Sequence, residues 1–88
     1  MSYEIIFSNS ARKELSKIEP LNRQRIADSI NELSDNPRPY GYIKLKGISE
    51  DIFRIRVGSF RILYAIDDQI KIVDIRKIAD RKDVYDAL

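Results

Sequence analysis

The chain has 88 residues, of which 43% are hydrophobic and 34% are charged, and its formal net charge at pH 7 is +2. This length predicts a single domain over residues 1–88, with one core of marginal stability. The lack of histidine excludes the usual general base, the usual zinc ligand and every Ser-His triad, and the lack of cysteine excludes disulfides and thiolate metal sites. The sequence has no long apolar run and no secretory signal, so we expect a cytoplasmic protein with no membrane partner and no metal.

The first 39 residues predict a strand followed by two helices. Residues 3–7 form a β-branched and aromatic run typical of a short strand, and the Ser-Asn-Ser segment at 8–10 supplies N-cap chemistry for the first helix. Pro20 suits the first turn of the second helix, which the Asp-Asn-Pro-Arg-Pro segment at 35–39 ends. Apolar residues recur at helical spacing at Ala11, Leu15 and Ile18, and again at Ile26, Ile30 and Leu33. Two helices with one apolar face each need a sheet to cover those faces.

After Pro39 the pattern changes to that of strands, at 42–46, 51–57, 60–66 and 69–76. The whole chain therefore predicts an α+β fold. We expect an N-terminal strand and an antiparallel helix pair packed on a mainly antiparallel, twisted four- to five-stranded sheet, with a short C-terminal helical tail.

Residues 53–64 predict a hairpin that gathers cations on one face. Apolar and basic residues alternate on both sides of the Gly-Ser pair at 58–59, which suits a two-residue type II′ turn. In that register Arg56 lies directly opposite Arg61, and Arg54 shares their face. Like charges in opposed positions are destabilising, so the arrangement indicates a binding site for an anion such as phosphate. The alternative is a set of solvated strand charges that discourage aggregation.

The distribution of charge favours a specific site. Residues 38–61 contain six basic residues and two acidic ones, although the net charge of the whole chain is only +2. A local basic face on a nearly neutral protein indicates a defined polyanion site rather than general coating of nucleic acid.

The next hairpin predicts a carboxylate beside the arginines. With a turn at 67–68, Ile66 faces Gln69 and Asp74 lies across from Arg61. A slip by one residue would bury the Asp74 carboxylate in the core. We therefore expect Asp74 to support the Arg61 guanidinium through a charge-assisted hydrogen bond, or to form an ordinary cross-strand ion pair with it.

The tail at 79–88 is the second candidate functional segment. Arg81 and Tyr85 stand four residues apart, as on one face of a helix. One interpretation is a solvated terminal turn in which Tyr85 only packs. The other is that Arg81 adds a hydrogen-bond donor for phosphate to the face that carries Arg54, Arg56 and Arg61, called here the arginine face. In that interpretation Tyr85 adds a proton-transfer group or a ring that stacks on a base.

Three sequence blocks are informative together. They are Lys-Leu-Lys-Gly at 44–47, Phe-Arg-Ile-Arg-Val-Gly-Ser-Phe-Arg-Ile-Leu-Tyr at 53–64, and Arg-Lys-Asp-Val-Tyr at 81–85. With these blocks, essentially the whole chain resembles the RelE branch of the RelE/ParE toxin superfamily. The Arg-x-x-Val-Tyr ending favours RelE over ParE.

The resemblance implies the toxin of a bacterial or archaeal type II toxin–antitoxin pair, which cuts mRNA in the ribosomal A site. The 2′-OH attacks the adjacent phosphate and leaves a 2′,3′-cyclic phosphate, with no metal or other cofactor. The implied partners are the ribosome, mRNA and a RelB-like antitoxin that blocks the basic face. Operator DNA would be contacted only indirectly, through the antitoxin.

Carried onto this chain, the resemblance assigns roles to individual residues. The catalytic candidates are Arg56, Arg61, Arg81 and Tyr85, and Arg54 is a substrate-binding candidate. From their charge, Lys44 and Lys46 are further substrate-binding candidates, which we expect to contact ribosomal RNA phosphates at the rim of the site. Two departures from the family pattern stand out. Arg54 and Arg56 occupy positions where the family often has lysine, and arginine keeps its proton, so neither acts as a general base. Ala79 and Asp80 stand before Arg81, where relatives carry a further arginine or a histidine.

Two other functions stay open on the sequence. A ParE-like DNA gyrase inhibitor would use the same scaffold as a protein-binding module and would not need Tyr85. A non-catalytic member would serve only to contact an antitoxin or RNA, and its expression would not arrest growth.

Overall fold

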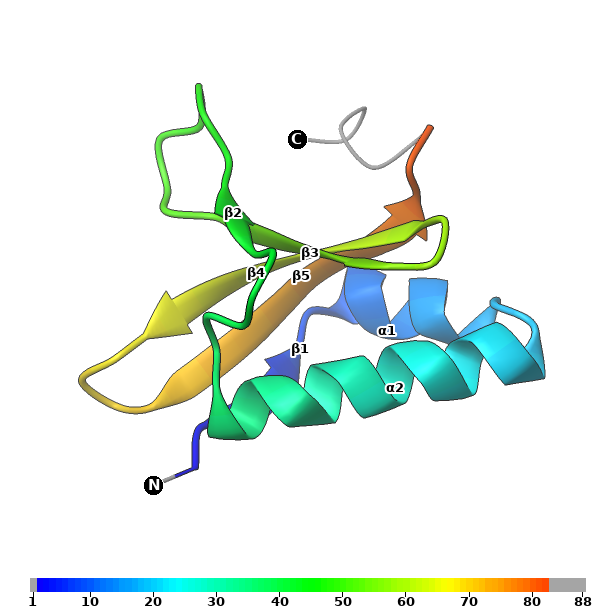
Figure 1. The fold of residues 1–88 in the computed structure, drawn as a ribbon, viewed down its shortest axis with the longest axis horizontal. Coiled ribbons are helices and arrows are strands. Elements are labelled where there is room, and N and C mark those ends of the chain that lie inside the picture. The colour runs from blue at the N-terminus through cyan, green and yellow to red at the C-terminus, as the bar shows by residue number, and fades with distance from the viewer. Residues whose placement is uncertain (1, 83–88) are drawn as a thin grey trace.

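The computed structural model describes residues 2–82, which form a five-stranded sheet with two helices on one of its faces (Figure 1). The elements are β1 (Glu4–Phe7), α1 (Asn9–Ser16), α2 (Pro20–Asp35), β2 (Ile43–Lys44), β3 (Phe53–Val57), β4 (Phe60–Asp67) and β5 (Ile72–Asp80). The strand order is β1-β5-β4-β3-β2, with β1 parallel to β5 and the other neighbours antiparallel. The predicted α+β architecture is confirmed. Most of the predicted helical tail, residues 83–88, lies outside the described residues.

Capping groups fix the starts of both helices. Ser8 Oγ accepts a hydrogen bond from Ala11 N at 3.0 Å at the start of α1. The Glu19 carboxylate accepts one from Asn22 N at 2.8 Å, and Pro20 occupies the first turn of α2. Both helices therefore begin where the sequence predicts.

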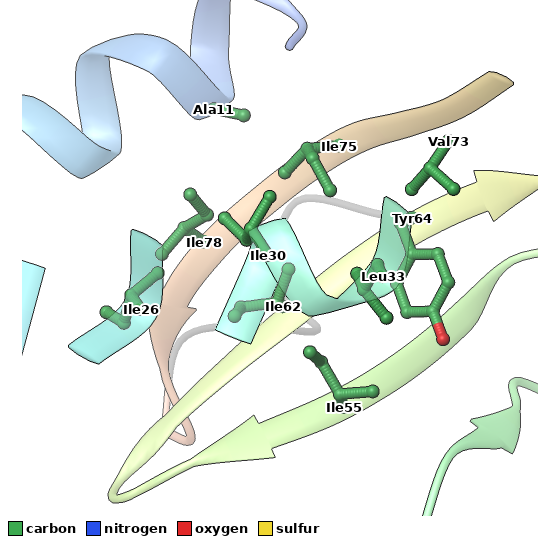
Figure 2. Packing of buried hydrophobic residues seen from close by; sticks show 10 residues of the cluster. All are labelled: Ala11, Ile26, Ile30, Leu33, Ile55, Ile62, Tyr64, Val73, Ile75 and Ile78. Atoms are coloured by element: carbon green, nitrogen blue, oxygen red, sulfur yellow. The ribbon is translucent and has the colours of Figure 1, made fainter. Parts of the chain in front are cut away.

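The main core lies between the helices and the central strands. Figure 2 shows Ile26, Ile30 and Leu33 of α2 among the side chains of the sheet. The buried strand residues of this core are Ile55, Ile62, Tyr64, Val73, Ile75 and Ile78. Tyr64 is fully buried, and its hydroxyl donates a hydrogen bond to Pro37 O at 2.7 Å, which ties the segment after α2 to the sheet.

The sheet face turned away from the helices, called here the open face, carries a second apolar cluster. The β2–β3 loop, residues 45–52, lies on this side of the sheet (Figure 1). Ile52 of the loop and Leu63 of β4 are buried together. Because strand side chains alternate between faces and its neighbours Ile62 and Tyr64 belong to the main core, Leu63 lies on the face of β4 turned away from that core. The loop is therefore anchored on the open face by apolar contacts.

The turn between β4 and β5 differs from the prediction. It spans four residues, 68–71, and the strands first pair at Asp67 and Ile72 rather than around a two-residue turn at 67–68. The Asp67 carboxylate accepts hydrogen bonds from two backbone N–H groups of the turn, at 3.0 and 3.1 Å. Lys71 closes the turn with a φ of 59°. The side chain of Asp67 thus stabilises a longer turn than strand alternation alone indicates.

Candidate functional site

Arg56 and Arg61 are cross-strand neighbours on the open face, and the predicted register of this hairpin is confirmed. Arg56 pairs with Arg61 and Val57 pairs with Phe60 across the turn. Gly58 has a φ of 60°, as the first turn residue requires. The Arg61 Nη1 donates to the carbonyl oxygens of Gly58 at 3.4 Å and Phe60 at 3.1 Å. Two guanidinium groups thus extend from positions about 5 Å apart.

Arg54 is the buried member of the arginine face. It lies between Ile43 of β2 and Leu63 of β4, and only 7% of it is exposed. Within the described part of the chain, its buried Nε has no hydrogen-bond partner. An unsatisfied buried donor costs about 1–3 kcal/mol, and an anionic ligand that reached this nitrogen would relieve the cost.

The end of β5 brings Arg81 next to the arginine hairpin. The Arg81 backbone N–H donates to Ser59 O at 3.0 Å, and Arg81 is exposed. Two residues earlier, Ala79 is the direct cross-strand neighbour of Arg61. Tyr85 lies outside the described residues, so its predicted position beside the arginines stays a prediction.

Lys44 and Lys46 line a hollow of 430 Å³ at the β2–β3 loop. Lys44 pairs with Phe53, whose side chain packs against the helix-side core, so the register places Lys44 on the other face from Arg54. The Lys44 Nζ forms an ion pair with Asp51 Oδ1 at 3.0 Å. The two lysines therefore lie together at the loop, and Lys44 does not share the face of the arginines.

The predicted pairing of Asp74 with Arg61 is wrong. Asp74 lies opposite Ala65, and its Oδ2 accepts a hydrogen bond from Arg76 Nε at 2.6 Å. The four-residue turn displaces β5 along β4, and a β-bulge farther along adds another residue to the shift.

The bulge produces an ion pair that the sequence analysis missed. Arg76 is the residue that the β4–β5 register skips between Ile75 and Lys77. The Arg76 Nη1 and Nη2 donate to the two carboxylate oxygens of Glu50 at 3.1 and 3.0 Å. Hydrogen bonding from Arg76 holds the pKa of Glu50 below its ordinary value. This pair joins the β2–β3 loop to β5.

Guanidinium groups are the main groups on the open face that could bind a ligand. Arginine keeps its charge, and its planar fork matches the oxygens of a phosphate. Among residues 2–82, no three acidic side chains gather closely enough to hold a metal ion. No helix in this part of the chain is long and apolar enough to cross a membrane.

Comparison with known proteins shows where this arginine-bearing fold belongs. A family described as the ParE toxin of the type II toxin-antitoxin system, parDE, matches residues 5–85. The chain belongs to the RelE/ParE toxin family of type II toxin–antitoxin systems. The match extends from β1 beyond the end of β5, so the family covers the whole sheet and the arginine face.

Named relatives place the chain among the RelE-like toxins of this family. It is 31% identical over 88 residues to the putative toxin RelE1 of Methanocaldococcus jannaschii, with 97% of each chain covered. It is 31% identical over 86 residues to the toxin RelG of Mycobacterium tuberculosis, covering 97% of this chain and 98% of that protein. A solved archaeal RelE-RelB complex from Pyrococcus horikoshii matches with a TM-score of 0.79 at 26% identity, covering 92% of this chain and 97% of that chain.

Proposed function

We propose that this RelE-like toxin is a ribosome-dependent endoribonuclease that cleaves mRNA in the ribosomal A site and so inhibits translation. The observation that carries the proposal is the direct opposition of Arg56 and Arg61 across β3 and β4. Like charges in opposed positions repel each other, and an anion bound between them would offset that repulsion. A phosphodiester is an anion that guanidinium groups bind well.

The proposed reaction is an internal transfer at one phosphate. The ribose 2′-oxygen attacks the adjacent phosphorus, and the bond from phosphorus to the 5′-oxygen breaks, which leaves a 2′,3′-cyclic phosphate and a 5′-hydroxyl. Arg56 and Arg61 stabilise the negative charge that grows on the non-bridging oxygens, and Arg81 also binds the phosphate. Tyr85, in its phenolate form, takes the proton of the 2′-hydroxyl, and water protonates the departing 5′-oxygen. Arg54 binds the RNA backbone or stabilises the departing 5′-oxygen.

Dependence on the ribosome is expected because the proposed site holds no strong general base. Arginine does not act as a base, and a phenol is a poor one near neutral pH. A ribosome that holds the message in an extended, aligned form in the A site would supply orientation that the toxin lacks on free RNA. Lys44 and Lys46, at the β2–β3 loop, would bind ribosomal RNA phosphates.

A RelB-like antitoxin is the proposed protein partner. The matching structure from Pyrococcus horikoshii is a RelE-RelB complex. In this chain, an antitoxin that covered Arg56 and Arg61 would compete directly with RNA. Operator DNA would be reached only through that antitoxin.

Inhibition of DNA gyrase is the second candidate function, because the family match over residues 5–85 carries the ParE description. Such an inhibitor would use the fold as a protein-binding module. Replacement of Tyr85 by phenylalanine separates the two candidates. It should abolish the toxicity of a ribonuclease and leave that of a gyrase inhibitor nearly unchanged.

Cleavage of a defined mRNA by purified toxin on programmed ribosomes tests the proposal. We expect cleavage in the A-site codon, and we expect Arg61→Ala to slow it by about 100-fold or more. Arg12→Ala is the matched control, because Arg12 is exposed on α1, which packs on the helix side of the sheet. Equal rates for wild type and Arg61→Ala, or no cleavage by wild type, would overturn the proposal.

A further inference from the structure

The β-bulge in β5 turns one arginine toward the loop that borders the arginine face. Arg76 is the residue that the β4–β5 register skips, and bulges often re-aim side chains near functional sites. Its Nη1 and Nη2 donate to Glu50 at 3.1 and 3.0 Å, and its Nε donates to Asp74 at 2.6 Å. Every nitrogen of this guanidinium therefore contacts a carboxylate.

The Glu50–Arg76 pair joins parts of the sheet that are not neighbours. Glu50 belongs to the β2–β3 loop, and Arg76 belongs to β5. In the sheet, β3 and β4 lie between β2 and β5. The loop must therefore cross the open face of β3 and β4 to make this contact.

The crossing brings the loop against the neighbours of two arginines. Ile52 of the loop is buried with Leu63, and Ala79 packs against the same cluster. Leu63 is the direct cross-strand neighbour of Arg54, and Ala79 is that of Arg61. The β2–β3 loop thus forms a wall beside both arginines.

We propose that Glu50 and Arg76 are positioning residues, which hold the β2–β3 loop as the wall that seats RNA beside Arg54 and Arg61. This role rests on the proposed ribonuclease function and adds two residues that act without touching the reacting atoms. The side chains of Arg76 and Glu50 are 35% and 59% exposed, and ion pairs this exposed add little stability. Its bidentate geometry nevertheless favours one arrangement of the loop, so the pair serves to orient the loop more than to hold the fold together.

Two variants test this role through the kinetics of mRNA cleavage on programmed ribosomes. Glu50→Gln removes one negative charge, whereas Arg76→Lys keeps the net charge and cannot form the bidentate pair. We expect both to raise KM for the programmed ribosome about tenfold with kcat nearly unchanged, because seating the RNA contributes to binding in ground and transition states alike. Simple electrostatics predicts the opposite for Glu50→Gln, namely tighter binding of RNA.

Asp68→Asn is the matched control. Asp68 forms a similar bidentate pair with Arg38, at 3.1 and 2.8 Å, and this replacement also removes one negative charge. It should leave KM at the wild-type value. Amide hydrogen exchange at residues 45–52 gives a readout that needs no activity, and we expect faster exchange in Glu50→Gln and Arg76→Lys and not in the control.

The outcomes separate the two proposals. If the wild type cleaves and both Glu50→Gln and Arg76→Lys share its KM, the positioning role is overturned and the ribonuclease function stands. If the wild type does not cleave mRNA on ribosomes, the proposed function fails and the positioning role fails with it.

Discussion

Arg56 on β3 and Arg61 on β4 are direct cross-strand neighbours that carry the same charge. The register that opposes them is fixed by the core, because the adjacent pair Ile55 and Ile62 is buried on the helix side. A slip by one residue would bring the arginines into that core. The fold therefore places two positive groups side by side, where a bound anion would offset their mutual repulsion.

Removal of one of these charges should increase stability and reduce activity. We expect Arg56→Gln to raise the free energy of unfolding by about 0.5 kcal/mol, since it ends the repulsion of opposed like charges. Cleavage should fall in the same variant. Urea unfolding and the ribosome cleavage assay measure the two effects. A variant that is less stable than wild type would indicate that Arg56 serves the fold.

Arg54 should show the same opposition between stability and activity. Its Nε is buried with no partner among the described residues, and methionine has a similar length without polar groups. We expect Arg54→Met to raise the free energy of unfolding by about 1 kcal/mol and to weaken RNA binding. Arg54→Lys, which keeps the charge, is the control and should retain more binding. Loss of stability in Arg54→Met would contradict the assignment.

Tyr64 should behave as a purely structural residue. Its buried hydroxyl donates to Pro37 O at 2.7 Å, and burial raises its pKa, so the hydroxyl keeps its proton. We expect Tyr64→Phe to lower the free energy of unfolding by about 1–2 kcal/mol, because the carbonyl is left unpaired. Tyr40→Phe, at an exposed position, should change nothing. The Tyr64 contribution should persist below pH 10 and disappear only as the pH rises above that value.

Asp68 should titrate at unusually low pH. Hydrogen bonds from Arg38, and then from Tyr3, lower its pKa from 3.8 to about 2. The charged form is favoured in the folded state, so its contribution to stability is complete above pH 3.8 and is lost as the pH falls through about 2. Carboxyl chemical shifts from an NMR titration measure this pKa. Arg38→Gln should return it toward 3.8, and a wild-type value already near 3.8 would refute the pairing.

Local chemistry explains which parts of the fold were predictable. The cap at Ser8, the first-turn proline Pro20 and the glycine turn at Gly58 involve residues close in sequence, and each element they mark is confirmed. The turn after β4 was predicted too short, because the hydrogen bonds accepted by the Asp67 carboxylate compete with simple alternation.

The spacing of the apolar residues in β5 already indicates the bulge. The core residues Val73, Ile75 and Ile78 change from odd to even positions, which strict alternation does not allow. A bulge at 76–77 accounts for this change and also for the Glu50–Arg76 pair. By contrast, the burial of Arg54 between two other strands depends on contacts distant in sequence. The alternation of apolar and basic residues along β3 predicts an exposed Arg54 and gives no indication of this burial.

The most direct test of the central claim is to map mRNA 5′ ends in cells after induced expression of wild type and of Arg61→Ala. We predict new ends inside translated codons that depend on Arg61 and disappear when translation initiation is blocked. Growth arrest with intact messages and induced DNA damage would contradict the account and assign the toxin to gyrase.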